Sequence, residues 1–177
     1  VSYCARVCCM YAIKQAMLLS GALPLADIAI YYMDIRAFGK GYEQFFQNAM
    51  AMGIEFVKGK VATISEGGNG GVRLHYEFQE DGGGVTSAEH DLVVLSLGMV
   101  PDWNPQGCCS ISCGSDGFIE TVKPKIAPTL TEMEGVFVAG AAAGPKDIVD
   151  TIAEAGAAAM EASKYLTSLP RSVKAVA

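Results

Sequence analysis

Three cysteines near the start of the chain constrain it most. Cys4, Cys8 and Cys9 lie within six residues and lead into an apolar, helix-like run through Lys14. Thiolates are soft ligands that suit zinc and iron–sulfur clusters, and a cubane cluster usually takes four of them. Cys-x3-Cys-Cys is not a usual zinc-ribbon spacing, so the motif favours an iron–sulfur site that needs one further ligand. Ordinary burial or redox-active thiols are the alternative.

The composition argues against several classes of protein. The chain has 177 residues, of which 51% are hydrophobic, and a net charge of -6. No stretch approaches the ~20 uninterrupted apolar residues that cross a bilayer, so we expect a soluble protein. The acidic balance disfavours nucleic acid as a partner, because such binders concentrate Lys and Arg on one face. Six cysteines among helix and strand patterns fit a reducing cytoplasm better than a secreted disulfide scaffold.

Helix and strand patterns alternate along the first part of the chain. Apolar residues recur at helical spacing over residues 8–20 and 42–52, and a glycine follows each run. Between these helices, residues 28–35 are typical of a buried parallel strand, and residues 54–57 begin the next strand. This order predicts an α/β fold.

The middle of the chain predicts an antiparallel meander. Runs 60–65 and 72–78 alternate apolar and polar residues and flank a glycine-rich turn, which is a hairpin signal. A second glycine turn at 81–84 leads to a further strand. We expect the uncharged run 92–100 to return to the main sheet.

An irregular connection at 101–117, which carries three more cysteines, predicts a domain boundary. We therefore divide the chain into residues 1–103 and 104–177. The second part is predicted to contain an extended segment at 118–126, a strand at 136–139, a final helix from about 148 to 166, and a loose tail beyond Pro170.

Three separated motifs resemble one family. They are Cys4-x3-Cys8-Cys9 running on through Lys14, Tyr32 to Tyr42, and Gly144-Pro-Lys-Asp-Ile148. They are similar to the A subunit of heterodisulfide reductases and its relatives, including the flavin subunits of quinone-interacting membrane-associated and sulfur-oxidising complexes. The likeness spans nearly the whole chain, and the order of elements resembles the latter part of thioredoxin-reductase-like flavoproteins with two dinucleotide-binding domains.

The resemblance implies FAD and a [4Fe–4S] cluster as cofactors. It makes Cys4, Cys8 and Cys9 three cluster ligands and places the fourth upstream of Val1, so we expect this chain to be a piece of a longer one. It assigns residues 1–103 to the second half of a nucleotide-binding-like domain and 104–177 to the C-terminal part of a FAD-binding domain. The Gly-x-Gly-x-x-Gly fingerprint for the FAD diphosphate is absent.

The function implied is that of an oxidoreductase subunit, active within a longer chain and a complex. It would relay electrons between flavin and iron–sulfur partner subunits in the cytoplasm, with no membrane span of its own. Association with a membrane through those partners, and a homodimer, are both compatible with this interpretation. No residue is expected to act as a covalent nucleophile. The alternatives are a pyridine-nucleotide-dependent flavin disulfide reductase in which Cys8, Cys9 or a neighbouring residue is a redox thiol, and a non-enzymatic docking module.

The expected flavin contacts follow the strand that ends near residue 139. Glycines let a backbone approach a ring closely, and the N–H groups that begin a helix favour partial negative charge on a ligand. The candidates are Gly140, Ala141, Gly144, Pro145, Lys146, Asp147 and Ile148. Asp147 is equally explained as the N-cap of the last helix. Lys14 is a further candidate that would favour reduced, anionic flavin, and its alternative is a solvated lysine.

Two other groups of residues have plainer explanations. The cysteines at 108, 109 and 113 invert the first motif's spacing, but a loop with incidental thiols explains them. Tyr32, Asp34 and Arg36 lie at the end of a predicted strand, where open α/β sheets bind ligands, although Asp34 and Arg36 are equally explained as a surface ion pair.

Overall fold

The computed structural model describes residues 1–78, 83–107 and 109–170. Residues 81 and 82 of the second predicted glycine turn, Cys108 and the tail beyond Pro170 lie outside the described residues. The chain divides into two compact units. We call Cys8–Leu97 the sheet unit, and Val1–Val7 together with Gly98–Ala177 the helix unit. The sequence pattern suggested a division after residue 103, whereas the compact units divide after Leu97.

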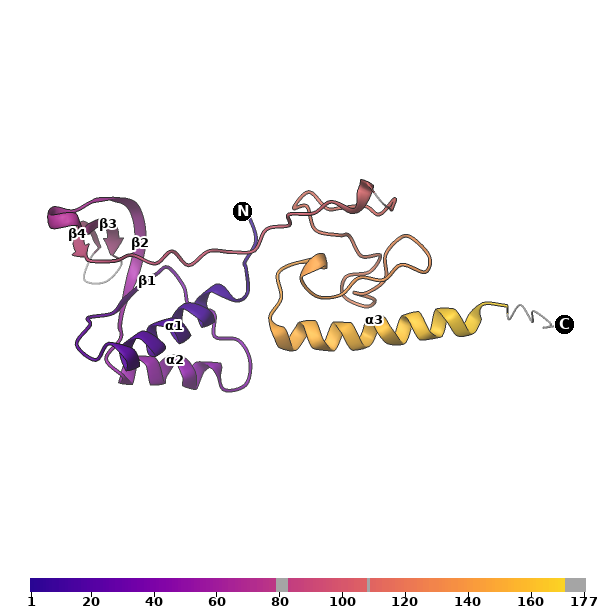
Figure 1. Cartoon of the computed structure of the whole chain (residues 1–177), viewed down its shortest axis with the longest axis horizontal. Helices are drawn as coiled ribbons and strands as arrows, with labels where there is room; N and C mark the ends of the chain where they lie inside the picture. Colours follow the sequence, from indigo (N-terminus) through magenta and orange to yellow (C-terminus); the bar gives the residue numbers. More distant parts are fainter. Residues whose placement is uncertain (79–82, 108, 171–177) are drawn as a thin grey trace. The chain divides into compact units, whose positions relative to one another are not determined.

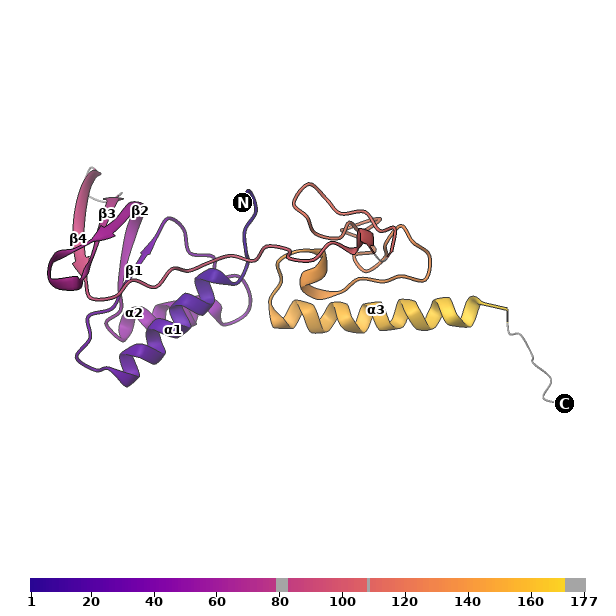
Figure 2. The same cartoon turned by 45° about the horizontal axis from the view of Figure 1, so that its top comes forward.

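The sheet unit has the predicted mixed α/β architecture. Its elements in order are α1 (Cys8–Ala22), β1 (Ala29–Tyr32), α2 (Tyr42–Ala51), β2 (Glu55–Glu66), the 3-10 turn η1 (Gly68–Gly70), β3 (Val72–Phe78) and β4 (Gly84–His90). The strand order in the sheet is β1-β2-β3-β4. β1 is parallel to β2, and β2, β3 and β4 form the predicted antiparallel meander. Figure 1 and Figure 2 show α1 and α2 side by side beneath the sheet.

The strand β2 is long enough to pair with two neighbouring strands. Its first residues pair with β1, from Ala29 opposite Glu55 to Tyr32 opposite Lys58, and the residues after them pair with β3. At the crossover stands Gly59, where an added Cβ would lie 2.4 Å from the Glu77 carbonyl oxygen. A side chain at this position would therefore push the two strands apart.

The core of the sheet unit lies between the helices and the sheet. Ile13 and Ala16 of α1, Ala49 of α2 and Ile54 before β2 are buried together. Ile13 and Ala16 lie three residues apart on α1, which places both on one face of the helix. β1 pairs in parallel with β2, as predicted, but it spans Ala29–Tyr32 and not the whole of residues 28–35. Its residues are half-buried at the edge of the described sheet, so the prediction of a buried strand was wrong in that respect.

Residues 92–97 are extended but form no strand, which corrects the prediction that this run joins the sheet. Leu92, Val94, Leu95 and Leu97 are exposed, and none of β1 to β4 pairs with them. Strand-like composition needs a neighbouring strand to form a ladder, and the described residues provide none here.

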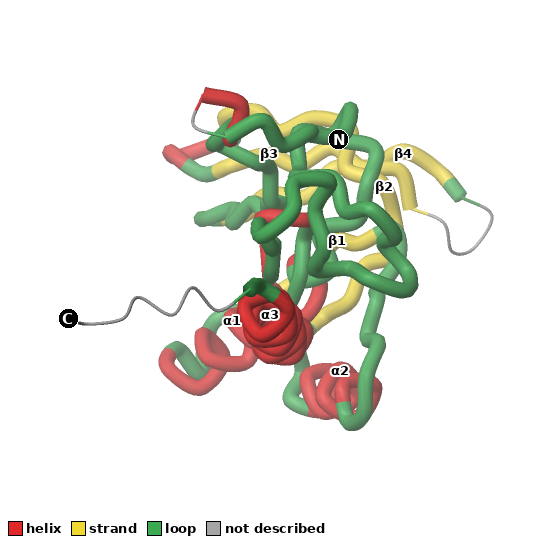
Figure 3. The backbone as a smooth tube through the Cα atoms, turned by 90° about the vertical axis from the view of Figure 1, so that its right-hand side faces the viewer, coloured by secondary structure: helices red, strands yellow, loops and turns green. Residues whose placement is uncertain are grey.

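The helix unit combines one long helix, seen lengthwise in Figure 1 and end-on in Figure 3, with irregular structure. Its helices are η2 (Pro105–Gly107), η3 (Gly140–Ala143) and α3 (Ile148–Ser168). The predicted strand at 136–139 is reduced to a single bridge between Leu130 and Phe137, so that prediction was also wrong. Among the helices of the described residues, none is long and apolar enough to cross a membrane.

Candidate functional site

Cys4 lies in a turn that is fixed within the helix unit. The Tyr3 hydroxyl donates to the Met99 carbonyl at 2.9 Å, and its ring packs edge-on against Phe118. The next residue after the cysteine, Ala5, is buried. Arg6 has a left-handed backbone with φ of 63°, and its N–H donates to Cys4 Sγ at 3.3 Å. The turn therefore presents an exposed sulfur that already accepts an amide hydrogen bond.

Cys8 and Cys9 lie in the sheet unit, at the first residues of α1. The Cys9 thiol donates to the Asp34 carbonyl at 3.8 Å, at the end of β1. The Ser96 hydroxyl donates to the Cys8 carbonyl at 3.2 Å. Because the helix begins at Cys8, Cys4 is not one helical turn below it, and a common helical face for these two thiols does not exist.

The donor chemistry of the motif fits an iron–sulfur cluster. Cys4 is exposed and the two later cysteines are half-buried, so their sulfurs are not sealed in a core. Hydrogen bonds to the sulfurs are one of the means by which proteins tune such clusters, and Arg6 supplies one to Cys4. Within the described ranges, no group of three or more His, Cys, Asp or Glu is already gathered around a metal position.

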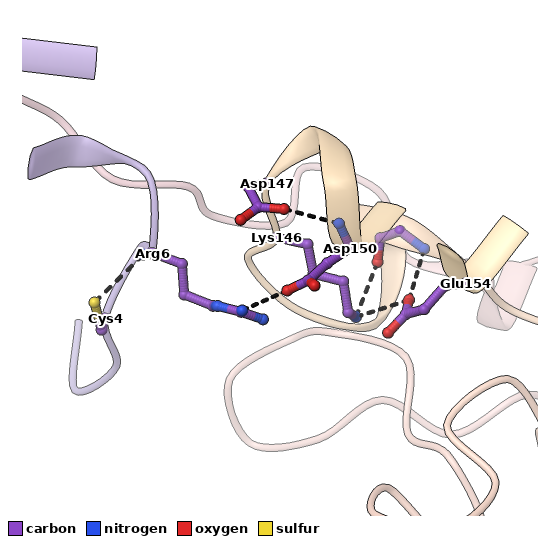
Figure 4. A network of polar contacts seen from close by, with 7 residues as sticks. Cys4, Arg6, Lys146, Asp147, Asp150 and Glu154 are labelled. Carbon is purple, nitrogen blue, oxygen red and sulfur yellow. Dashed lines mark hydrogen bonds and ion pairs between the residues drawn. The ribbon is translucent and has the colours of Figure 1, made fainter. Parts of the chain in front are cut away.

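Arg6 also makes a contact far along the sequence within the helix unit. Its guanidinium donates to the Asp150 carboxylate, in the first turn of α3 (Figure 4). That turn is capped by Asp147, whose Oδ1 accepts from the Asp150 N–H at 2.8 Å. The interpretation of Asp147 as an N-cap is therefore confirmed.

A second polar network holds the glycine loop before α3. The Glu154 carboxylate accepts from the Gly140 N–H at 3.0 Å and lies 3.2 Å from Lys146 Nζ. The lysine also donates to the Gly140 carbonyl at 3.2 Å (Figure 4). The two charged side chains are only 12% and 16% exposed, so the pair is mostly shielded from solvent. The network ties both ends of the loop to the helix.

These contacts already engage hydrogen-bonding groups of some of the predicted flavin residues. The Gly140 N–H and the Lys146 amine are already used inside the protein. Ala141 and Ile148 are exposed, while Gly144, Pro145 and Asp147 are half-buried. The first N–H groups of a helix have no intrahelical partner, so α3 still offers donors at this end. The backbone start of α3, more than the side chains before it, can therefore face a ligand.

Gly140 itself is required by the geometry. Its φ is +66°, and an added Cβ would lie 2.9 Å from the Thr151 methyl group on α3. The loop thus packs against the helix as closely as a residue without a side chain permits.

Other predicted residues have simpler surroundings. Lys14 is exposed on α1. Asp34 and Arg36 form the surface ion pair foreseen as an alternative, at 3.5 Å and with side chains 70% and 62% exposed. Cys109 and Cys113 lie in the irregular part of the helix unit.

The pKa values of Glu132, Glu89 and Tyr31 are shifted from their usual values. Hydrogen bonds from the Ser112 hydroxyl and N–H lower the pKa of Glu132. The hydrogen bond and charge of Arg73 lower the pKa of Glu89. Burial raises the pKa of Tyr31, whose hydroxyl lies 2.9 Å from His90 Nε2. None of these groups belongs to the predicted cofactor residues.

The sequence reasoning missed Arg6, Asp150 and Glu154. Arg6 and Asp150 contact each other although they are far apart in the sequence. Glu154 contacts Gly140, which lies outside its own helix. A local signal existed for Arg6 alone among these three, because it lies within the cysteine motif.

Comparison with known proteins identifies sequence relatives. No family model matches the chain. It is 43% identical over 170 residues, 94% of its length, to the second iron–sulfur A subunit of CoB–CoM heterodisulfide reductase from Methanopyrus kandleri. It is 41% identical over 169 residues, 91% of its length, to the A subunit of the H(2):CoB-CoM heterodisulfide,ferredoxin reductase from Methanothermobacter thermautotrophicus. The chain spans 26% and 25% of these two relatives.

Among solved structures, thioredoxin reductase from Streptococcus pyogenes is similar at 22% identity with a TM-score of 0.44. The match covers 90% of this chain and 50% of that one. The α/β class with a mixed sheet follows from the chain's own elements.

The sequence relatives are components of reductases, and the chain belongs to this class of oxidoreductase proteins. More particularly, it belongs to the family of heterodisulfide reductase A subunits and corresponds to about a quarter of the length of those relatives.

Proposed function

We propose that this chain is part of a FAD- and [4Fe–4S]-containing oxidoreductase subunit of the heterodisulfide reductase type. The observation that carries the proposal is about 40% identity over nine tenths of the chain to relatives of that name, one of them called an iron–sulfur subunit. The thiol motif at the start of the chain supplies the donors that such a cluster needs.

Cys4, Cys8 and Cys9 are the proposed cluster ligands, and a fourth ligand comes from outside this chain. Cys4 is held by the fixed turn before Arg6, while Cys8 and Cys9 are held by the start of α1.

The glycine loop before α3 is the proposed flavin contact. The contacts of Gly140, Lys146 and Glu154 hold the loop's shape, and the helix start presents N–H donors beside it. Ala141, Gly144, Pro145, Asp147 and Ile148 complete the proposed surface, and Lys14 is a further proposed contact. FAD bound there would supply the two-electron chemistry, and the protein would supply its position and polarity.

Iron–sulfur proteins are the proposed partners, and the proposed reaction is electron relay between them and the flavin. We infer a cytoplasmic location, because the cluster thiols are best kept reduced there.

The proposal is tested by iron, sulfide and flavin content together with an absorbance spectrum. The protein is purified anaerobically, both as this chain and with its natural N-terminal extension. We expect about four irons per chain and bound FAD in the extended form, as a [4Fe–4S] assignment demands. Flavin without iron would favour the thiol reductase, and neither cofactor would contradict both enzyme assignments.

A docking module is the second candidate, favoured by one observation. The apolar side chains Ile148, Val149, Ile152 and Met160 of α3 are between 66% and 78% exposed. Exposed apolar surface of this kind marks interaction sites. This candidate predicts self-association of the chain and no cofactor in the extended protein.

A further inference from the structure

Arg6 connects the cysteine turn to α3 through two different groups. Its backbone N–H donates to Cys4 Sγ, and its guanidinium donates to Asp150. Both contacts lie within the helix unit. One residue therefore touches a proposed cluster ligand and the first turn of the helix that follows the proposed flavin loop.

The backbone conformation of Arg6 is unusual for its residue type. A φ of 63° is uncommon for a residue with a long side chain and is usually left to glycine or asparagine. Just before this left-handed residue, the chain turns so that the Arg6 N–H donates to Cys4 Sγ. Burial of Ala5 on one side and the Asp150 pair on the other hold the turn in place.

Asp150, the partner of Arg6 on α3, is also held by hydrogen bonding. Asp150 is positioned by its own N–H, which donates to the Asp147 cap. The carboxylate also lies in the first turn of α3, where negative charge is favoured by the helix dipole. The side chains of Arg6 and Asp150 are 36% and 42% exposed, so the pair is accessible to solvent but not fully so.

We propose that Arg6 is a positioning residue for Cys4: it aims the sulfur through its N–H and fixes the turn to α3 through Asp150. The inference rests on the proposed function, because it assigns Cys4 to a cluster. It adds a coupling between the cluster and the flavin loop, carried by residues Cys4, Arg6, Asp150 and the capped start of α3.

The test uses the N-terminally extended protein and measures how fast a chelator removes iron under anaerobic conditions. The variants are Arg6→Gln and Asp150→Asn, which each break the ion pair from one side. Arg6→Lys is the conservative variant that keeps the positive charge. The matched control is Arg73→Gln, which breaks the pair of Arg73 with Glu89, whose side chains are 44% and 50% exposed.

We expect Arg6→Gln and Asp150→Asn to lose iron about two to five times faster than the wild type, the size usual for a partly exposed ion pair. Arg6→Lys and Arg73→Gln should stay near the wild-type rate. The electron paramagnetic resonance spectrum of the reduced cluster should change in Arg6→Gln, which a merely structural role would leave unaltered.

Wild-type release rates and an unchanged resonance spectrum in Arg6→Gln and Asp150→Asn would overturn the inference while leaving the proposed function intact. Absence of iron from the wild-type extended protein would instead overturn the proposed function. The two failures are therefore distinguishable in one set of samples.

Discussion

The sheet unit and the helix unit differ in where they bury their apolar side chains. The sheet unit buries Ile13, Ala16, Ala49 and Ile54 between two helices and a hydrogen-bonded sheet. In the helix unit, the 21 residues of α3 include no buried side chain. Buried apolar residues of this unit, among them Ile111, Phe118 and Val138, lie instead in its irregular part. The first unit is stabilised by a cluster of buried apolar residues shared between its helices and its sheet. In the second unit, apolar burial lies away from α3, and polar contacts hold the start of that helix.

This difference indicates where single changes will act. A core residue affects the whole sheet unit, because packing is shared among its neighbours. A polar link such as Lys146 with Glu154 affects one loop. The proposed cofactor residues use both kinds of support, since Cys8 and Cys9 begin a core helix whereas Cys4 and the glycine loop rely on polar links.

The largest expected effect is the loss of iron binding when a proposed cluster ligand is replaced. Cys8→Ser should abolish iron binding in the extended protein and leave its flavin, because a cubane cluster needs its thiolates. Cys113→Ser, a change in the helix unit away from the motif, is the control and should leave iron unchanged. Iron content is measured with FAD content in the same samples. Full iron in Cys8→Ser would remove this residue from the ligand set.

The next effect contrasts a core residue with an exposed one. Ile13 is fully buried in α1, whereas Ile152 of α3 is 67% exposed. Ile13→Ala should lower the free energy of unfolding of the sheet unit by about 2–5 kcal/mol. Ile152→Ala should change stability by no more than about 0.5 kcal/mol. Hydrogen exchange of the α1 and α3 amides measures each unit separately, and equal effects would show that the contrast is mistaken.

A weaker effect concerns two glycines of the helix unit. Gly140→Ala should destabilise the loop by about 1–2 kcal/mol through its positive φ, with a further cost from contact with Thr151. Gly156 lies within α3 with open space around it, so Gly156→Ala should stabilise the helix by about 0.5–1 kcal/mol. Thermal unfolding compares both variants. A stabilising Gly140→Ala would contradict the close packing described for this loop.

The weakest effect is a pH dependence. The folded protein lowers the pKa of Glu132 through hydrogen bonds from Ser112. A lowered pKa contributes stability above the unfolded value, and this is lost as the pH falls through the folded value. Glu132→Gln should therefore be less stable than the wild type at neutral pH. In strong acid the two proteins should be equally stable. Unfolding at several pH values measures this, and a difference that grows toward low pH would reverse the assigned sign.

Much of the fold could be predicted from local patterns. The helices near 8–20, 42–52 and 148–166, and the hairpin around the glycine-rich turn, are all present. These elements have signals within a few residues of each other, such as apolar residues at helical spacing followed by a glycine, or the capping side chain of Asp147. Local chemistry was sufficient for them.

What sequence reasoning could not supply depends on distant neighbours. Residues 92–97 have the composition of a strand but lack a partner among the described residues. The first seven residues pack with the second half of the chain, through Tyr3 with Phe118 and Arg6 with Asp150. The contact of Glu154 with Gly140 likewise joins a helix to the loop before it. No periodicity within one segment encodes such pairings.

Native mass spectrometry of the anaerobically purified, N-terminally extended protein decides whether one chain of this family holds both FAD and an iron–sulfur cluster. The method keeps bound cofactors on the protein and weighs each species separately, so it distinguishes one doubly loaded chain from two singly loaded ones. We expect a major species that carries both cofactors on the same molecule. A spectrum in which the extended chain carries no iron–sulfur cluster, with or without FAD, would contradict the proposed function.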